Sequence, residues 1–293
     1  MKKDIKTCDL HTHTRFSDGT LSPCELIDKA IEANLSAIAL TDHNTVGGLC
    51  EFEDHAKERG IEYASGVEFS TAYGNIEFHV IGLFIDRERF DEVTSFIGKF
   101  KERKTESNLA LLSSLARDGY VIDYEKLVAK TPDGYINRAH IASEMVRLGY
   151  VDSVKDAFSR FLSEGAGYYK PPMRNGFFET IDFIGKIGAV SILAHPLLQV
   201  SGEELRALLP EATAHGLCAI ETQYSLYSSE DTDFSSALAR EFGLLESGGS
   251  DFHGANKPDH FLGVGLGNLC IPYVFYEQLK EKAVEIKRNS EGA

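Results

Sequence analysis

The feature that most constrains this 293-residue chain is an alternation of strand and helix patterns, which occurs before and after a long helical stretch. In residues 1–86, short apolar runs such as residues 37–40 alternate with apolar side chains at helical spacing. The alternation resumes after Pro171 and Pro172 and ends in a helix predicted over residues 273–287. Because strands that alternate with helices pair in parallel, the sequence predicts an α/β protein whose two segments close into one barrel. The predicted strands are residues 7–10, 37–40, 61–71, 76–85, 189–193, 217–221 and 244–247.

Residues 87–170 differ from the rest of the chain, because they carry helical patterns without intervening strands. The first and longest helix is predicted over residues 87–116, and shorter helices follow it. The sequence therefore predicts two domains: a barrel made of residues 1–86 and 171–293, and a helical insert made of residues 87–170.

Composition excludes several classes of protein. No run of about 18 apolar residues offers a membrane span. The chain start leads into the first predicted strand without an apolar signal core, which indicates a cytoplasmic protein. The formal charge of −15 argues against an extended nucleic-acid surface, although a few cations and metal ions can still bind a small anionic substrate. The five scattered cysteines predict neither a disulfide framework nor a thiolate zinc site, and the oligomeric state stays open.

Histidine and carboxylate side chains recur where the predicted strands end. His11 and His13 follow the first strand, and in an extended segment residues two apart point the same way, so both imidazoles can meet one metal ion. A single H-x-H is more often two ordinary histidines, but here the pattern recurs at the strand ends where barrel enzymes assemble their sites. Imidazole and carboxylate ligands without cysteine suit Mn, Fe or Zn. The candidate ligands are His11, His13, Asp18, His43, Glu68, His79, His195, Asp251 and His253.

Six short motifs together resemble the PHP (polymerase and histidinol phosphatase) family. The resemblance spans nearly the whole chain, and the combination is specific although no single motif is. It implies a distorted (β/α)7 barrel with a helical insert, which binds up to three divalent metal ions at the carboxyl ends of the strands. The motifs are D-L-H-T-H-T-R-F-S-D-G at 9–19, T-D-H-N at 41–44, G-V-E-F at 66–69, F-H-V-I-G-L at 78–83, L-A-H-P at 193–196 and S-D-F-H-G at 250–254.

The resemblance also implies how the ligands are shared among the metal ions. The first ion would be held by His11, His13, Glu68 and Asp251. Glu68 would bridge to a second ion held by His79 and His195, and a third would be held by Asp18, His43 and His253. Asp18 stands where some relatives have histidine, and Asn44 replaces a common aspartate outside the ligand set.

The insert resembles that of a PHP subgroup acting on nucleoside phosphates, which includes adenosine 3′,5′-bisphosphate phosphatases. The matching segment is N-R-A-H-I-A at 137–142, so Arg138 and His140 are candidates for binding the substrate phosphate. The alternative is that Arg138 is a solvated helix residue and His140 a cap or core group. Lys170 and Arg174, at the junction with the barrel, are further candidates, but they could equally be flanking charges. A run of cations, Lys99, Lys101, Arg103 and Lys104, is expected to be a solvated helix face, and the alternative is that one of them leans over the active site.

The predicted reaction is hydrolysis of a small phosphomonoester, a nucleoside phosphate such as AMP or adenosine 3′,5′-bisphosphate. Two or three clustered divalent ions lower the pKa of a bound water, toward roughly 7 in the best cases, so that hydroxide can attack phosphorus. Arg138 would help to neutralise the phosphoryl oxygens. The proton for the leaving alcohol could come from a metal-bound water, His140 or Asp42, and a strand-end carboxylate, Glu221, could orient a ligand histidine or have no such role.

Other functions remain open at this point. Within the family, the alternatives are a histidinol-phosphate phosphatase and an exonuclease that shortens small oligonucleotides. From other classes, the alternatives are a non-catalytic metal-binding regulatory module and an amidohydrolase, since barrels with an H-x-H motif and a late aspartate also hydrolyse C–N bonds. A complete set of candidate ligands disfavours the regulatory module, and the Asp42-His43 and Asp251-x-His253 pairs disfavour the amidohydrolase.

Overall fold

A computed structural model describes residues 6–131, 136–172 and 174–291. The first residues, on which the absence of a signal core was argued, lie outside this range. Seven strands follow one another around a barrel-like sheet in the order β1-β2-β3-β4-β6-β7-β8, and a short strand, β5, pairs with β3. The strands are β1 (Cys8–Asp9), β2 (Ala37–Leu40), β3 (Glu62–Tyr73), β4 (Ile76–Leu83), β5 (Asn175–Gly176), β6 (Val190–Ala194), β7 (Ala219–Tyr224) and β8 (Leu245–Gly249).

The sheet is parallel except around β4, which runs antiparallel to both β3 and β6. The reason is local: only Gly74 and Asn75 separate β3 from β4, and so short a connection forms a hairpin, whereas parallel strands need a longer crossover. The sheet comes close to closing because the backbone N–H of Leu10 donates to the carbonyl of Gly248, 3.1 Å away, beside β8. The barrel predicted from the alternation is therefore confirmed, with one reversed strand.

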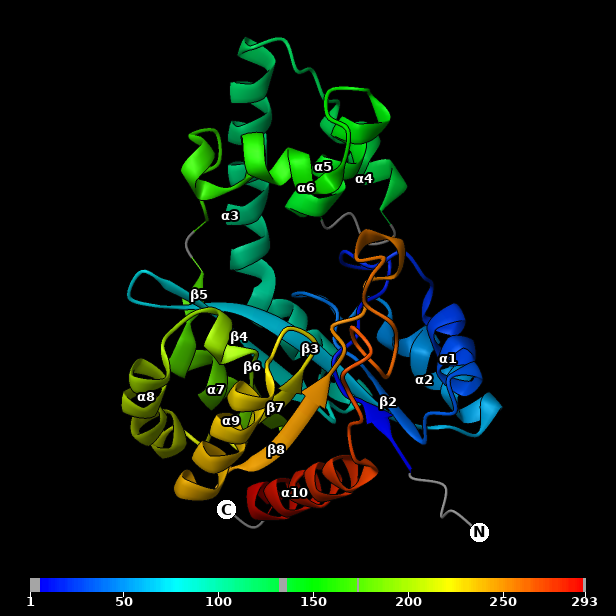
Figure 1. The fold of residues 1–293 in the computed structure, drawn as a ribbon, viewed down its shortest axis with the longest axis vertical. Coiled ribbons are helices and arrows are strands. Elements are labelled where there is room, and N and C mark those ends of the chain that lie inside the picture. Colours follow the sequence, from blue (N-terminus) through cyan, green and yellow to red (C-terminus); the bar gives the residue numbers. More distant parts are fainter. Residues whose placement is uncertain (1–5, 132–135, 173, 292–293) are drawn as a thin grey trace.

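Side chains alternate between the inside and the outside of the barrel. In β2, Ala37 and Ala39 belong to an interior cluster, while Ile38 and Leu40 pack outward against the surrounding helices. The C-terminal helix α10 (Tyr273–Glu291) lies across one end of the barrel and contributes Tyr276 to the interior cluster (Figure 1). The outer helices are α1 (Pro23–Glu32), α2 (Leu49–Arg59), α7 (Phe177–Lys186), α8 (Gly202–Ala214) and α9 (Ser229–Phe242).

Only helical elements lie between β4 and β5 among the described residues, and they project from the end of the barrel opposite α10 (Figure 1). The longest, α3, begins with Phe90, Val93 and Ile97 in the barrel's outer core and later places Leu111 and Leu115 in a separate insert core. We therefore propose that the predicted domain division holds, with α3 shared by both units. The other helices of the insert are α4 (Tyr124–Lys130), α5 (Arg138–Arg147), α6 (Val154–Ala157) and three short ones; α3 itself spans Phe90–Arg117.

Candidate metal centre

All nine candidate ligands come together at one end of the barrel. Most of them follow the carboxyl ends of parallel strands as predicted, whereas Glu68 lies inside β3 and His79 lies in the first half of the antiparallel β4. They form four overlapping groups in which the potential ligand atoms lie within 4.8 Å of one another. The grouping differs from the implied one, because His79 and His195 fall in separate groups, although both lie close to Glu68. The groups are His13, Asp18, His43 and His253; His11, Glu68 and His195; His11, His13 and Asp251; and His43, Glu68 and His79.

Glu68 is the centre of the cluster. Its Oε2 lies 3.1 Å from His11 Nε2, 3.2 Å from His13 Nε2 and 3.1 Å from His43 Nδ1. None of these four buried atoms has a hydrogen-bond partner among the described residues. An unpaired buried polar atom costs about 1–3 kcal/mol, so four atoms facing one small space need a common partner. A divalent cation fits this donor set, since it accepts lone pairs from imidazole and carboxylate together.

The electrostatics of the cluster favour an ionised carboxylate. Burial raises the pKa of Glu68, but the surrounding His43, His11 and His79 outweigh this effect and hold it well below its usual range. Burial likewise opposes the charged form of His11, yet the carboxylates of Glu68 and Glu221 raise its pKa well above the ordinary value. A cation bound here would take over the role of the imidazole protons, so metal binding is expected to release protons.

Glu221 orients two of the candidate ligands from β7. Its Oε1 lies 3.2 Å from His11 Nδ1, and its Oε2 accepts a hydrogen bond of 2.8 Å from the backbone N–H of His195. A proton on His11 Nδ1, shared with Glu221, leaves the lone pair of Nε2 directed at the cluster. Of the two roles considered for Glu221, the geometry favours the orienting one.

Asp251 is held by two side chains that the sequence did not single out. Tyr224 Oη donates to Asp251 Oδ2 at 2.7 Å, and Lys257 Nζ donates to the same oxygen at 2.6 Å. The other oxygen, Oδ1, therefore remains for the cluster, 3.3 Å from His13 Nε2. Tyr224 lies at the end of β7, three residues beyond the end of the predicted strand, and nothing in the sequence pattern marked Lys257.

Asp42 has a different place from the one predicted for a proton donor. Its carboxylate accepts hydrogen bonds from the backbone N–H of Thr14 at 2.8 Å, from Thr14 Oγ1 at 2.5 Å and from Ser17 Oγ at 2.5 Å. Ser17 Oγ also lies 3.4 Å from His13 Nδ1. Asp42 is thus buried beneath the loop after β1, where it fixes the loop and, through Ser17, the ring of His13. The proposed donor role is not retained.

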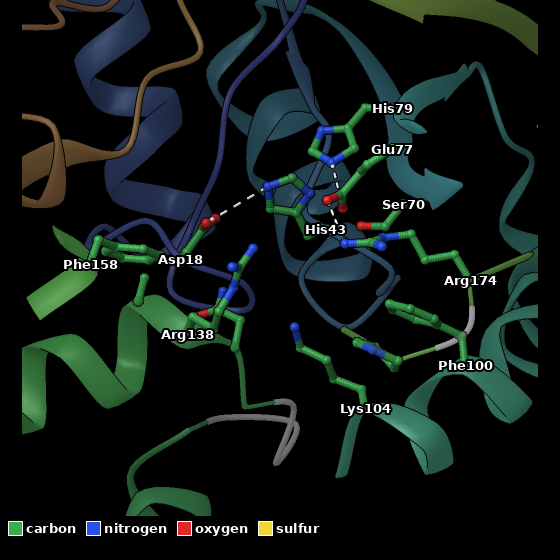
Figure 2. Close-up of a pocket in the computed structure, with 13 residues that line it drawn as sticks. Asp18, His43, Ser70, Glu77, His79, Phe100, Lys104, Arg138, Phe158 and Arg174 are labelled. Atoms are coloured by element: carbon green, nitrogen blue, oxygen red, sulfur yellow. Dashed lines mark hydrogen bonds and ion pairs between the residues drawn. The ribbon is translucent and has the colours of Figure 1, made fainter. Parts of the chain in front are cut away.

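A pocket opens beside the cluster, with Asp18, His43 and His79 on one side (Figure 2). Lys104 and Arg138 approach from the other side, and Arg174 lies next to Glu77. Arg138 is held in place because its guanidinium stacks 4.2 Å from the centre of the Tyr169 ring and donates to the Leu162 carbonyl at 3.1 Å. Arg174 pairs with Glu77. The lining residues that carry charge or a ring are Asp18, His43, Glu77, His79, Phe100, Lys104, Arg138, Phe158 and Arg174.

The structure separates the other substrate-binding candidates from this pocket. His140 Nδ1 accepts from the backbone N–H of Asn137 as part of the capping box of α5, and the ring lines a different groove. Lys170 is exposed and is not among the residues that line the pocket. Conversely, Lys104 is not on a solvated helix face as expected, because it is 9% exposed and lines the pocket.

A barrel that gathers buried imidazoles and carboxylates around unsatisfied lone pairs, beside a pocket walled by cations, defines a metal-dependent hydrolase of phosphate esters. Comparison with known proteins agrees with this class. The profile of the PHP domain family matches residues 9–166, more than half of the chain. The chain belongs to the PHP domain family, as its motifs suggested.

Three similar proteins show what this family membership covers. A 5′-3′ exoribonuclease from Haemophilus influenzae is 32% identical, covering 85% of this chain and 90% of its own length. A 3′,5′-nucleoside bisphosphate phosphatase from Chromobacterium violaceum is 30% identical, and the match covers 90% of this chain and 94% of that protein. A solved structure from Bifidobacterium adolescentis, described as a metal-dependent phosphoesterase, has a TM-score of 0.84 at 25% identity, covering 94% and 96%.

These findings confirm the predicted class of enzyme. The chain is a metal-dependent phosphoesterase, a hydrolase acting on phosphoric ester bonds. The PHP type of the predicted barrel is confirmed as well. In the part of the chain that the structure describes, no helix is long and apolar enough to cross a membrane. The cytoplasmic location stays a prediction.

Proposed function

We propose that this enzyme removes one phosphate from a small nucleotide that carries two, represented by adenosine 3′,5′-bisphosphate. The observation that carries the proposal is that three basic side chains share a pocket with candidate metal ligands. They are Lys104, Arg138 and Arg174. The metal centre would receive the phosphate that is hydrolysed, and the cations would bind the one that stays. AMP, which has a single phosphate, would offer these cations no second phosphate. The similarity to the bisphosphate phosphatase supports this choice.

The ligand roles are part of the same proposal. Glu68 would be shared between metal ions, with His11 and His195 toward one side and His43 and His79 toward the other. Two or three divalent ions, Mn, Fe or Zn, would activate water for attack on phosphorus and neutralise the charge of the reacting phosphate.

The side chains around the pocket would bind and orient the substrate. We propose that water, rather than Asp42 or His140, protonates the leaving alcohol, since neither side chain is among the residues that line the pocket. Arg138 would bind a phosphate oxygen through a guanidinium already fixed by Tyr169 and Leu162, so little side-chain entropy is lost on binding. Lys170, exposed and outside the lining, is left with a flanking role.

A second candidate substrate is a short 5′-phosphorylated oligonucleotide. A groove beside the β3–β4 hairpin shares Glu77, Pro172 and Arg174 with the pocket, so a chain longer than one nucleotide has a continuous way out. The similarity to the exoribonuclease favours the same candidate. Histidinol phosphate has no observation of this kind in its favour, because its positively charged amine would face the cations.

The test is a substrate panel on protein loaded separately with Mn, Fe and Zn. We expect the highest kcat/KM for adenosine 3′,5′-bisphosphate, lower values for AMP and adenosine 3′-phosphate, and the lowest for histidinol phosphate. Arg138→Leu should bring the bisphosphate down to the level of the monophosphates, by about 10- to 100-fold, which corresponds to one lost charge-assisted contact. A 5′-phosphorylated trinucleotide that outperforms the bisphosphate would replace the first proposal by the second.

A further inference from the structure

Lys104 is a buried amine for which neither the fold nor the metal centre requires a charge. It lies on α3, and its side chain points toward the space between Arg138 and Arg174 (Figure 2). Its Nζ donates to Tyr169 Oη at 3.4 Å and lies 5.5 Å from the centre of that ring. Among the described residues, no carboxylate oxygen lies within 4.0 Å of this amine. A buried lysine without an anionic partner among the described residues is unusual, and an anion that enters the pocket would compensate its burial.

The charged groups that face Lys104 are unevenly balanced. Arg138 on α5 and Arg174 beside β5 carry the same charge as a protonated Lys104. The two nearby carboxylates are already engaged, Glu77 with Arg174 and His79, and Asp18 with His253 and His43. Burial, followed by the Arg138 guanidinium, lowers the pKa of Lys104 to about 7; Arg174 adds to the effect and Glu77 opposes it. In the free pocket near neutral pH, Lys104 is therefore divided between its charged and uncharged forms.

Tyr169 positions two of the three cations at once. One ring supports the guanidinium of Arg138 at 4.2 Å and the amine of Lys104 at 5.5 Å, and its hydroxyl accepts a hydrogen bond from the same amine. Tyr169 is itself 3% exposed, in the core of the insert. The positions of Arg138 and Lys104, which we call the cationic wall together with Arg174, are therefore fixed before an anion binds. Only the protonation state of Lys104 would change on binding.

We propose that Lys104 binds the phosphate that stays on the nucleotide and takes up a proton as that phosphate enters, so that recognition of a doubly anionic group is linked to pH. This inference rests on the proposed function, since it assigns the second phosphate to the cationic wall. The proton comes from solvent, and an ammonium ion then faces the phosphate in a pocket that excludes much of the water. Binding should weaken as pH rises through about 7, because the proton taken up becomes scarcer.

The direct test measures the ionisation of Lys104 without relying on catalysis. The full-length, metal-loaded protein is acylated with trace reagent between pH 6 and 10, with and without inorganic sulfate, and labelling is read by mass spectrometry. Lys126, exposed on α4, is the internal control. We expect Lys104 to titrate near neutral pH without sulfate and at least one pH unit higher with it, while Lys126 does not change. A Lys104 titration that coincides with that of Lys126, or that ignores sulfate, overturns the proposal.

Kinetic variants supply an independent readout with adenosine 3′,5′-bisphosphate as substrate. The KM of the wild type should rise by up to about tenfold per pH unit above neutrality, until the pH exceeds the higher pKa that Lys104 has in the complex. In Lys104→Arg, which keeps its charge, KM should be low at every pH. In Lys104→Met, which has no charge, KM should be high at every pH. If all three proteins show the same pH profile of KM, Lys104 has no such role, whereas lack of turnover by every one of them would refute the bisphosphate assignment and leave the labelling result valid.

The positioning role of Tyr169 is separated from a purely structural one by two matched variants. Tyr169→Phe keeps the ring beneath Arg138 but loses the hydroxyl that contacts Lys104, so we expect a several-fold rise in KM at pH 6 with native thermal stability. Tyr168→Phe, whose hydroxyl contacts Asp118 instead, should leave KM unchanged. Equal effects of the two substitutions would contradict the positioning role.

Discussion

At the scale of single residues, Glu68 contacts more of the candidate ligands than its sequence motif suggested. One carboxylate oxygen faces three imidazole nitrogens, and the other lies 2.7 Å from His79 Nδ1 and 3.1 Å from His195 Nε2. Its position inside a long, fully paired part of β3 explains this, since a strand interior fixes a side chain better than a loop does.

Replacing this carboxylate should therefore disable the site and spare the fold. Glu68→Gln removes the negative charge but keeps the size, and we expect kcat/KM to fall by at least about 1,000-fold, roughly 4 kcal/mol of transition-state stabilisation. Bound metal, measured by elemental analysis, should fall with it. Glu62→Gln at the exposed start of the same strand is the matched control and should retain activity. Near-native turnover of a metal-loaded Glu68→Gln protein would contradict the proposed role.

The residues also show what sequence reasoning can reach. The clustering of the nine candidate ligands was predictable because most of them follow strand ends, which a barrel brings together, although Glu68 and His79 lie within strands. Asp42 was assigned too close to the chemistry, although neighbouring residues of an extended segment point to opposite sides and His43 already occupied the inner one. Similarly, Arg138 and His140 stand two apart at the start of a helix, where side chains diverge, so one segment match could not place both in one pocket. That one cation of the run ending at Lys104 leans over the site was a considered alternative, but the choice of Lys104 could not be made from the sequence, because its burial depends on how the insert packs against its own helix.

At the scale of elements, the insert is stabilised by a core of its own. Leu115 on α3 is fully buried and packs with residues of α4 and α5. Leu115→Ala should destabilise this core by about 2–5 kcal/mol. We expect faster hydrogen exchange in α4 and α5 and a higher KM, with the metal content unchanged. Leu109→Ala, 47% exposed on the same helix, should have no such effect. Loss of bound metal in the Leu115→Ala protein would show that the two cores are not separable.

The contact between α4 and α5 predicts a defined dependence on acid. Hydrogen bonds from Arg147 lower the pKa of Glu144 to about 2, with Lys130 contributing and burial opposing. Because the folded pKa lies below the ordinary value of 4.5, the stabilisation is present above pH 4.5 and is lost as pH falls toward 2. Both cations are more than half exposed, so the effect is about 1 kcal/mol. Urea unfolding should show wild type more stable than Glu144→Gln at pH 7 by this amount, with a smaller difference at pH 4. A constant difference would contradict the ionic origin.

At the scale of the whole molecule, the overall fold was predictable from the alternation of patterns, and the reversed β4 follows from its two-residue turn. The partition of ligands among metal ions was not predictable, because it depends on ångström-scale distances around Glu68 that no spacing rule contains. The buried imidazole nitrogens without hydrogen-bond partners link the stability of the fold to metal binding, because bound cations would supply the partners that these atoms lack.

Removal of metal should therefore weaken the entire barrel. A ligand present at 100 times its dissociation constant stabilises a protein by about 2.7 kcal/mol. We expect dialysis against a chelator to lower Tm reversibly, and readdition of Mn, Fe or Zn to restore it. Hydrogen exchange should increase near β1 and β8, which the ligands after these strands hold together. An unchanged Tm in verified metal-free protein would mean that the cluster is preorganised without ions.

The continuous helix α3, with 28 residues, extends for about 42 Å. It is anchored in the barrel at its beginning and in the insert at its end, and it carries Lys104 between these anchors. A rigid rod fastened at two points sets the separation between the two places where phosphates would be received. The enzyme would then select nucleotides by the spacing of their phosphates as well as by total charge.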